Sequence, residues 1–254
     1  QNNPRQIAVN NVVQTNGLIL QDALIDFFVR ERFLIGVSVD GCREIHDQNR
    51  LDAKGKPTYD RVMANIQRLK DAGAAYNILC VLTDEVARRA DAVLDALIPH
   101  RYLQFIPCMD PIDGASAPAL TADAYARFLA RSFERYEALF FAGPPLSIRF
   151  FDNLVNMLCG HAPESCAMCG HCGLAPVIES DGSVYPCDFY ALDEWKLGNI
   201  LEMPLRRILS GPKALQFVAR SMDVPEECRQ CLWYSLCRNG CYRERDGQTH
   251  PSCP

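Results

Sequence analysis

The chain has 254 residues, 48% of them hydrophobic and 22% charged, which is enough to bury a substantial core. Its formal net charge of −5 provides no basic surface for nucleic acid, and no apolar run reaches the roughly 20 residues that span a membrane. Residues 1–5 are polar and unlike a signal peptide, so we expect a cytoplasmic protein whose cysteines stay reduced.

The first 158 residues alternate short β-branched runs with amphipathic stretches. Their apolar spacing predicts strands over 7–15, 33–39, 76–82 and 102–107. It predicts helices over 20–30, 59–71, 86–97 and 122–139. This alternation is typical of an α/β fold with a parallel sheet and crossover helices, either an open sheet or a barrel.

Polar residues gather where predicted strands end, at 14–17, 38–41 and 104–107. Ligands bind at the carboxyl ends of strands in parallel α/β folds, so these segments are candidate binding residues, although each could be only a turn. Thr58 and Thr121 are expected to cap helix N-termini.

The composition changes after Leu158. The segments become short, turn dipeptides such as Asp181-Gly182 appear, and cysteines accumulate. We therefore predict two domains, residues 1–158 and 159–254.

The thirteen cysteines are unevenly distributed. We expect the four scattered ones, Cys42, Cys80, Cys108 and Cys159, to be small buried hydrophobic residues. The other nine lie between Cys166 and Cys253, and such a dense cluster in a cytosolic protein indicates metal binding.

The spacing of these cysteines suits two metal centres. Eight of the nine, all except Cys169, form the patterns Cys166-x5-Cys172 followed by Cys187, and Cys228-x2-Cys231-x5-Cys237-x3-Cys241 followed by Cys253. Eight thiolates could hold two four-cysteine iron–sulfur clusters or two structural zinc ions. Redox or disulfide chemistry is a third alternative, and spacing alone leaves all three open.

These residues resemble a known family. The cysteines from Cys172 and Cys187 to Cys253 are similar to the SPASM domain of radical S-adenosylmethionine enzymes. The segment 181–190 resembles one branch, the anaerobic sulfatase-maturating enzymes. Further segments similar to that branch are Gln14-Thr15-Asn16-Gly17, Ser38-Val39-Asp40-Gly41, Ile45-His46-Asp47, Gln104-Phe105-Ile106-Pro107 and Leu197-Gly198-Asn199-Ile200.

The resemblance implies a partial (β/α)6 radical S-adenosylmethionine barrel over 1–158, lacking its first strands. A SPASM domain with two auxiliary 4Fe–4S clusters would follow over 159–254. The first cysteine set, which would hold the first auxiliary cluster, is Cys166, Cys172, Cys187 and Cys241. The second cysteine set, for the second cluster, is Cys228, Cys231, Cys237 and Cys253.

The family also binds a catalytic third 4Fe–4S cluster through a Cys-x3-Cys-x2-Cys loop. That spacing does not occur in these residues, so we expect the loop to lie upstream and the chain to be inactive alone. In the intact enzyme, the resemblance implies that this cluster reduces S-adenosylmethionine to a 5′-deoxyadenosyl radical. The radical would remove a β-hydrogen from a sulfatase cysteine or serine, leading to Cα-formylglycine.

The resemblance also assigns roles to single residues. Asp188, directly after Cys187, matches the proposed general base. Ser38, Gln14 and Asn16 are candidate contacts to S-adenosylmethionine or substrate. We expect Arg50 and Arg61 to be surface arginines rather than cofactor contacts, and His46 to be structural.

Three functions are compatible with the sequence. The favoured one is an oxidoreductase that matures sulfatases, with a sulfatase polypeptide as substrate and a flavodoxin- or ferredoxin-type electron donor. The second is a SPASM enzyme that forms thioether or carbon–carbon crosslinks on a ribosomal peptide. The third is a non-catalytic iron–sulfur electron-transfer module.

Overall fold

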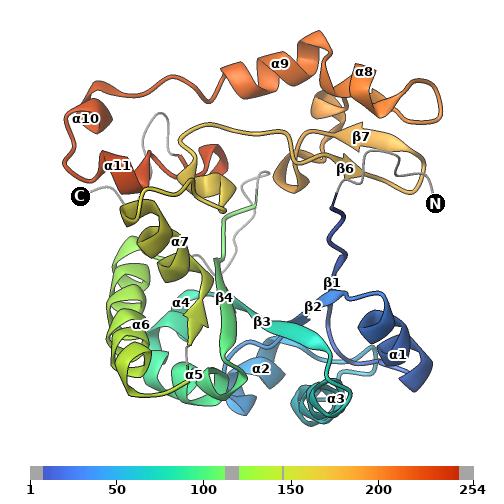
Figure 1. Ribbon diagram of the computed structural model, residues 1–254, viewed down its shortest axis with the longest axis vertical. Helices are drawn as coiled ribbons and strands as arrows, with labels where there is room; N and C mark the ends of the chain where they lie inside the picture. The colour runs from blue at the N-terminus through green and yellow to red at the C-terminus, as the bar shows by residue number, and fades with distance from the viewer. Residues whose placement is uncertain (1–7, 112–119, 145, 246–254) are drawn as a thin grey trace. The chain divides into compact units, whose positions relative to one another are not determined.

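The computed structural model describes residues 8–111, 120–144 and 146–245 (Figure 1). Contacts between residues divide the chain into two units, 1–152 and 153–254. The division falls within helix α7 (Arg149–Leu158), at whose end the sequence predicted the boundary. Across the described residues, every helix is too short or too polar to cross a membrane.

A five-stranded parallel sheet forms the centre of the first unit. Its strands lie in the order β1-β2-β3-β4-β5. They are β1 (Val12–Thr15), β2 (Leu34–Ser38), β3 (Ala75–Leu82), β4 (Tyr102–Pro107) and β5 (Ser147–Ile148). The predicted parallel α/β fold is therefore confirmed, and β5 is a strand that the sequence analysis missed.

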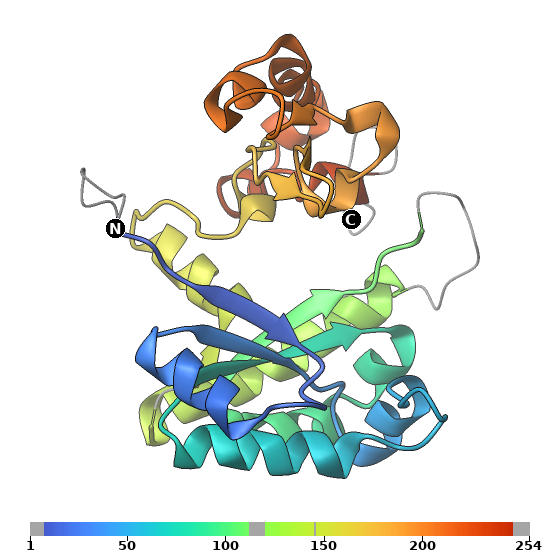
Figure 2. The same ribbon diagram turned by 90° about the vertical axis from the view of Figure 1, so that its right-hand side faces the viewer.

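Helices cover one face of this sheet (Figures 1 and 2). They are α1 (Asp22–Arg30), α2 (Arg43–Asn49), α3 (Tyr59–Asp71), α4 (Asp84–Arg88), α5 (Ala90–Leu97), the short 3-10 helix η1 (Ile98–His100) and α6 (Ala122–Ala142). The predicted single helix over 86–97 is wrong, because the backbone breaks at Arg89 (φ −106°, ψ 35°) between α4 and α5. Helix α2 was not predicted.

The covered face of the sheet is apolar and tightly buried. Ile78, Cys80 and Leu82 alternate along β3 with exposures of 0 to 1%. Helix α3 packs with Val62, Ile66 and Leu69, each at most 1% exposed, as their helical spacing predicts. This packing fixes which side chains of each strand point to the opposite face.

The opposite face of the sheet is more polar. Gln14, Gly36 and Asn77 are aligned across β1, β2 and β3, and Ser38 is aligned with Leu79 and then Gln104 in the next row. Aligned residues of neighbouring strands share a face, so two predicted cofactor contacts, Gln14 and Ser38, lie on the same side.

The second unit is built from short elements. Its antiparallel sheet has the order β6-β7-β8, with β6 (Val177–Ile178), β7 (Ser183–Tyr185) and β8 (Gly198–Asn199). Its helices are α8 (Leu205–Leu209), α9 (Pro212–Ala219), α10 (Glu226–Arg229) and α11 (Tyr234–Cys237). Its 3-10 helices are η2 (Cys166–Met168), η3 (Asp188–Tyr190), η4 (Asp193–Trp195) and η5 (Tyr242–Glu244).

The dipeptide Asp181-Gly182 forms the β6–β7 turn. The Asp181 carboxylate accepts hydrogen bonds from the Ser183 N–H at 2.9 Å and the Ser183 hydroxyl at 2.7 Å. Gly182 has φ +82°, and a Cβ there would lie 2.7 Å from Asn199 Oδ1. This turn sets the register of β7, which leads directly to Cys187.

Candidate functional site

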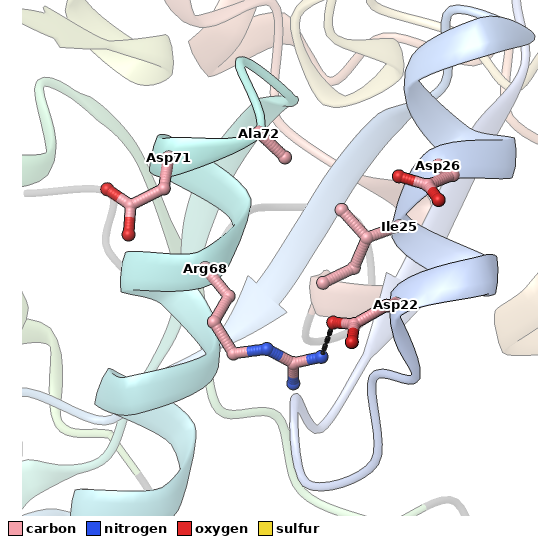
Figure 3. Close-up of a pocket in the computed structure, with 6 residues that line it drawn as sticks. All are labelled: Asp22, Ile25, Asp26, Arg68, Asp71 and Ala72. Carbon is pink, nitrogen blue, oxygen red and sulfur yellow. Dashed lines mark hydrogen bonds and ion pairs between the residues drawn. The ribbon is translucent and has the colours of Figure 1, made fainter.

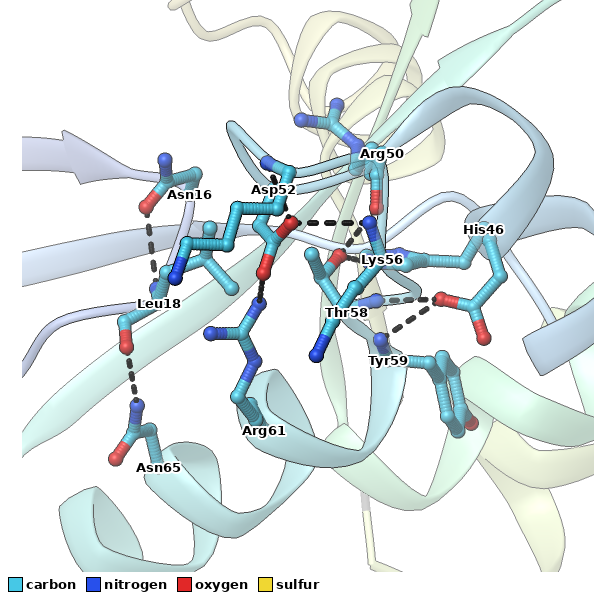
Figure 4. A network of polar contacts seen from close by, with 12 residues as sticks. Asn16, Leu18, His46, Arg50, Asp52, Lys56, Thr58, Tyr59, Arg61 and Asn65 are labelled. Atoms are coloured by element: carbon cyan, nitrogen blue, oxygen red, sulfur yellow. Dashed lines mark hydrogen bonds and ion pairs between the residues drawn. The ribbon is translucent and has the colours of Figure 1, made fainter.

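The turn after β1 is held by hydrogen bonds of its own residues and by helix α3. Thr15 Oγ1 accepts the Gly17 N–H at 3.1 Å, and Asn16 Oδ1 accepts the Leu18 N–H at 3.1 Å. From α3, the buried Asn65 amide donates to the Gly17 carbonyl at 2.8 Å and to the Leu18 carbonyl at 3.3 Å, the second of which is drawn in Figure 4. The turn therefore has a fixed shape that leaves the side chain of Asn16 exposed.

Only glycine fits position 17. Its φ is +70°, and a Cβ would lie 2.9 Å from Val37 Cγ1 and 3.1 Å from Val62 Cγ1. The glycine of the Gln14-Thr15-Asn16-Gly17 segment thus lets the chain turn closely against β2 and α3.

The polar sheet face includes two residues that the sequence analysis did not single out. Asn77 lies in the row of Gln14, and Arg149, at the start of α7, donates to Gln104 Oε1 at 3.1 Å. Asn77 could have been found as a polar residue between apolar neighbours at a period of two. The role of Arg149 depends on β5, which is too short to give a sequence pattern.

A second polar network closes the end of β2. Asp40, 6% exposed, accepts the Val81 N–H at 3.0 Å and pairs with Arg50 at 2.5 Å. Arg61 pairs with Asp52 at 2.9 Å (Figure 4). Both arginines are thus paired with carboxylates; Arg61 is exposed, as expected of a surface arginine, whereas Arg50 is half-buried.

His46 is structural, as expected. Its ring is fully buried; Nδ1 accepts the Asp40 N–H at 3.3 Å, and Nε2 lies 3.1 Å from Thr58 Oγ1. Thr58 Oγ1 in turn donates to the Arg50 carbonyl. An acceptor at Nδ1 places the proton on Nε2, and burial lowers the pKa of His46, so the ring stays neutral.

A cavity of about 260 Å³ lies between α1 and α3 (Figure 3). Its lining residues are Asp22, Ile25, Asp26, Arg68, Asp71 and Ala72. None of them is a predicted site residue, and Arg68 already pairs with Asp22. The cavity is a feature of the outer helical layer, separate from the polar sheet face.

Among the four scattered cysteines, the expected burial holds for Cys80 alone. Cys80 is 1% exposed and burial raises the pKa of its thiol. Cys42 and Cys108 are half-buried, and Cys159 is exposed. The expectation was wrong for these three because they lie beyond the ends of core elements: Cys42 precedes α2, Cys108 follows β4 and Cys159 follows α7.

The first cysteine set comes together from four separate segments. Cys166 begins η2, Cys187 follows β7 and Cys241 precedes η5, while Cys172 donates its N–H to Ser221 Oγ at 2.7 Å. Cys166 interacts electrostatically with Cys172 and Cys241, and Cys241 with Cys187. Residues 75 positions apart in sequence, Cys166 and Cys241, are therefore neighbours in space.

Three of these four thiols, those of Cys172, Cys187 and Cys241, are partly desolvated, whereas Cys166 is exposed. Burial raises the pKa of Cys241 to about 11, and burial together with the hydrogen bond to Asp188 raises the pKa of Cys187 to about 12. A metal centre held by these thiols would displace their protons on binding.

In the described part of the chain, no three Cys, His, Asp or Glu side chains converge closely enough to hold one metal ion.

The second cysteine set is described in part, since Cys253 lies outside the described residues. Cys228 is buried on α10, and its carbonyl accepts the Cys231 N–H at 3.2 Å in the tight turn that follows. Cys231 and Cys237 are exposed. The extra Cys169 donates its S–H to the Ser165 carbonyl at 3.6 Å.

Asp188 is exposed at the start of η3. Its Oδ1 accepts the Phe189 N–H at 3.0 Å and the Cys187 S–H at 3.1 Å. Both contacts use one carboxylate oxygen, so the side chain is oriented while it remains accessible to a proton donor.

Comparisons with known proteins agree with this arrangement. The family of the SPASM iron–sulfur cluster-binding domain matches residues 166–232. A cysteine-type anaerobic sulfatase-maturating enzyme of Clostridium novyi (strain NT) is 41% identical over 96% of this chain and 67% of its own length. The chain belongs to the anaerobic sulfatase-maturating enzymes. It is thus part of a radical S-adenosylmethionine enzyme with a SPASM domain, and it spans about two thirds of the length of that relative.

Other members of the sulfatase-maturating family differ in type. The serine-type enzyme of Bacteroides thetaiotaomicron is 30% identical over 95% of this chain and 63% of its own. The solved structure of native anSMEcpe with bound AdoMet and Cp18Cys peptide has a TM-score of 0.92 and 38% identity, covering 97% of this chain and 70% of its own. Streptococcus suis SuiB bound to its precursor peptide SuiA, at 14% identity and a TM-score of 0.64 over 96% of this chain and 57% of its own, shares the fold alone.

Proposed function

We propose that this protein oxidises the active-site cysteine of a sulfatase to Cα-formylglycine. The observation that carries the choice of cysteine is the 41% identity to a cysteine-type enzyme, against 30% for a serine-type enzyme of the same family. Crosslink formation has no comparable support, because the likeness to SuiB extends only to the fold.

We further propose that the first and second cysteine sets hold two auxiliary 4Fe–4S clusters, and that the intact protein also binds S-adenosylmethionine and a third cluster. S-adenosylmethionine with its cluster supplies the radical chemistry that removes hydrogen from the target residue. The chain's own residues would bind S-adenosylmethionine, orient the substrate and accept the substrate's proton.

The polar sheet face suits the binding of S-adenosylmethionine. Gln14, Ser38 and Asn16 would contact its polar groups, since amide and hydroxyl side chains both donate and accept hydrogen bonds. Asn65 would act through Gly17, keeping the turn after β1 in place. On the helix-covered face, by contrast, the residues of β3 are the apolar and buried Ile78, Cys80 and Leu82.

Asp188 would be the general base. The substrate loses a proton as it becomes more oxidised, and an accessible carboxylate can accept it. The Phe189 N–H keeps Oδ1 oriented, so the acceptor does not have to be ordered at the moment of transfer.

We place the protein in the cytoplasm, where thiolates remain reduced and available to iron. Its partners would be a sulfatase polypeptide and a small electron-donor protein of the flavodoxin or ferredoxin type.

The test uses the full-length protein with reconstituted clusters and a peptide carrying a Cys-x-Pro-x-Arg motif. We expect release of 5′-deoxyadenosine and the mass change for conversion of cysteine to formylglycine. A matched peptide with serine in place of cysteine should react more slowly. Loss of two hydrogens from the cysteine peptide, with formation of a crosslink, would contradict the proposal.

A further inference from the structure

One arginine in the second unit lies in an unusual environment. Arg220 directly follows α9, and its guanidinium carbon is 4.1 Å from the ring centre of Tyr190, 4.2 Å from Trp195, 4.3 Å from Phe217 and 4.7 Å from Tyr242. These four rings are called the Arg220 cage below. Cation–π contacts stabilise a desolvated guanidinium, and four of them surround this one.

The charge of Arg220 is only partly compensated inside its cage. Its Nε and Nη2 are buried and have no hydrogen-bond partner, and no ion pair in the described part of the chain includes Arg220. Burying an unpaired charge is costly, so its presence calls for an anionic partner.

The Arg220 cage is built on the segments that carry the first cysteine set. Tyr190 ends η3, which begins directly after Cys187, and Tyr242 directly follows Cys241. Ser221, next to Arg220, accepts the Cys172 N–H at 2.7 Å. Three of the four cysteines are thus linked to Arg220 or its cage. Cys187 and Cys241 lie close in sequence to cage residues, and Cys172 is hydrogen-bonded to Ser221.

A second arginine fixes this arrangement. Arg245 stacks over Tyr242 at 5.3 Å and donates to the carbonyls of Asn239 at 3.0 Å and Ser221 at 3.2 Å. Arg245 therefore links Asn239, which lies two residues before Cys241, to Ser221, which is next to Arg220.

We propose that Arg220 is a positioning residue that tunes the first auxiliary cluster, its caged cation stabilising the reduced state and raising the reduction potential. This inference rests on the proposed ligation of a 4Fe–4S cluster by the first cysteine set. Reduction adds one electron to a group that four thiolates already make negative, so a fixed, desolvated cation favours the reduced form. The aromatic rings of the cage hold the cation but carry no charge, so they do not neutralise it. A carboxylate partner would neutralise it.

The test measures the reduction potential of this cluster in the full-length, reconstituted protein by electrochemical titration with electron paramagnetic resonance detection. The relevant signal is the one that a Cys172→Ala variant lacks. Arg220→Gln should retain its iron and shift this potential to a more negative value. Arg220→Lys should remain close to the wild-type potential, because a lysine also carries a charge that cation–π contacts stabilise.

Arg206→Gln is the matched control, since Arg206 is exposed on α8 in the same unit. It removes the same net charge and should leave the potential unchanged. An unchanged potential in iron-loaded Arg220→Gln would overturn the inference, and so would an equal shift in Arg220→Lys. Loss of the cluster in Arg220→Gln would show a structural role instead. A wild-type protein without any signal dependent on Cys172 would refute the proposed ligation itself.

Discussion

At the scale of single residues, the proposed chemistry depends on Asp188 as the general base. We expect Asp188→Asn to lower turnover by roughly 10²–10⁴-fold, because an amide keeps the shape of the side chain but cannot accept the proton. Iron content should not change, since the Cys187 thiolate is left intact. The measurement is formylglycine formation per reconstituted enzyme.

The matched control for Asp188 is Asp193→Asn, an exposed carboxylate at the start of η4. It should turn over substrate at the wild-type rate. Wild-type turnover in Asp188→Asn would remove this residue as the base.

Asn65 is a second residue whose effect can be measured. Asn65→Leu should lower the free energy of unfolding by about 1–3 kcal/mol, because the Gly17 carbonyl loses its donor. S-adenosylmethionine binding should weaken with it, since the turn after β1 carries Asn16. Gln67→Leu, which also replaces a side-chain amide by leucine but at an exposed position of α3, is the control. Equal stability of the two variants would contradict the role of Asn65.

His100 makes the stability of the first unit dependent on pH. Burial lowers the pKa of His100 from its usual value to about 4, and Lys70 adds to the effect. The unfolded chain takes up the proton below about pH 6.5, whereas the folded chain does so only near pH 4. Stability from the neutral ring is therefore present above pH 6.5 and is lost as the pH falls.

The expected loss between pH 7.5 and pH 4.5 is about 1–3 kcal/mol, measured by urea unfolding at each pH. His100→Gln should show a smaller pH dependence, because its side chain does not titrate. A variant with the same pH dependence as the wild type would assign the effect to other groups.

At the scale of elements, the end of α3 depends on backbone conformation. Gly73 has φ +70°, and its N–H donates to the Lys70 carbonyl while the Ala74 N–H donates to Leu69, as in a glycine C-cap. Gly73→Ala should cost about 1 kcal/mol from strain alone, since no atom lies within 4 Å of a Cβ there. The measurement is the urea midpoint.

Gly143, the C-cap of α6, provides the matched control for Gly73. It also has open space for a Cβ, but its φ of −176° suits any residue. Gly143→Ala should be neutral or slightly stabilising, because it restricts the unfolded chain. Similar destabilisation of both variants would mean that strain at φ +70° is not the cause.

Elements with a clear periodicity were predictable from the sequence. The bounds of β4 and α3 agree with the prediction. The predicted capping of α3 by the Thr58 side chain is wrong. Asp47, from α2, accepts the N–H groups of Thr58 and Tyr59 at 2.9 Å, while the Thr58 hydroxyl donates to the Arg50 carbonyl. A cap supplied from another helix leaves no local pattern.

The candidate site shows a similar division. Motifs indicated Gln14, Ser38 and Asp188, but the shared face of Gln14 and Ser38 follows from strand register, which a sequence does not show. The Arg220 cage could not be predicted from the sequence either, because its rings come from four separate segments of the chain. The role of Asp188 and the ligation by each cysteine set remain predictions.

At the scale of the whole molecule, the two units are stabilised differently. The first has a five-stranded sheet with a buried helical layer, whereas the second has strands of two or three residues. So small a sheet cannot stabilise a fold by itself, and binding of iron by the cysteine sets would supply the missing free energy.

Removing iron should therefore affect the units unequally. We expect amide hydrogen exchange across 153–245 to become roughly tenfold faster or more when the reconstituted protein is stripped with a chelator. Peptides from β2 and β3 should keep their protection, because their core contains no proposed ligand, and they serve as the internal reference. Rebuilding the clusters should restore the slow exchange. Equal acceleration in both units would show that they unfold together and that iron stabilises the chain as a whole.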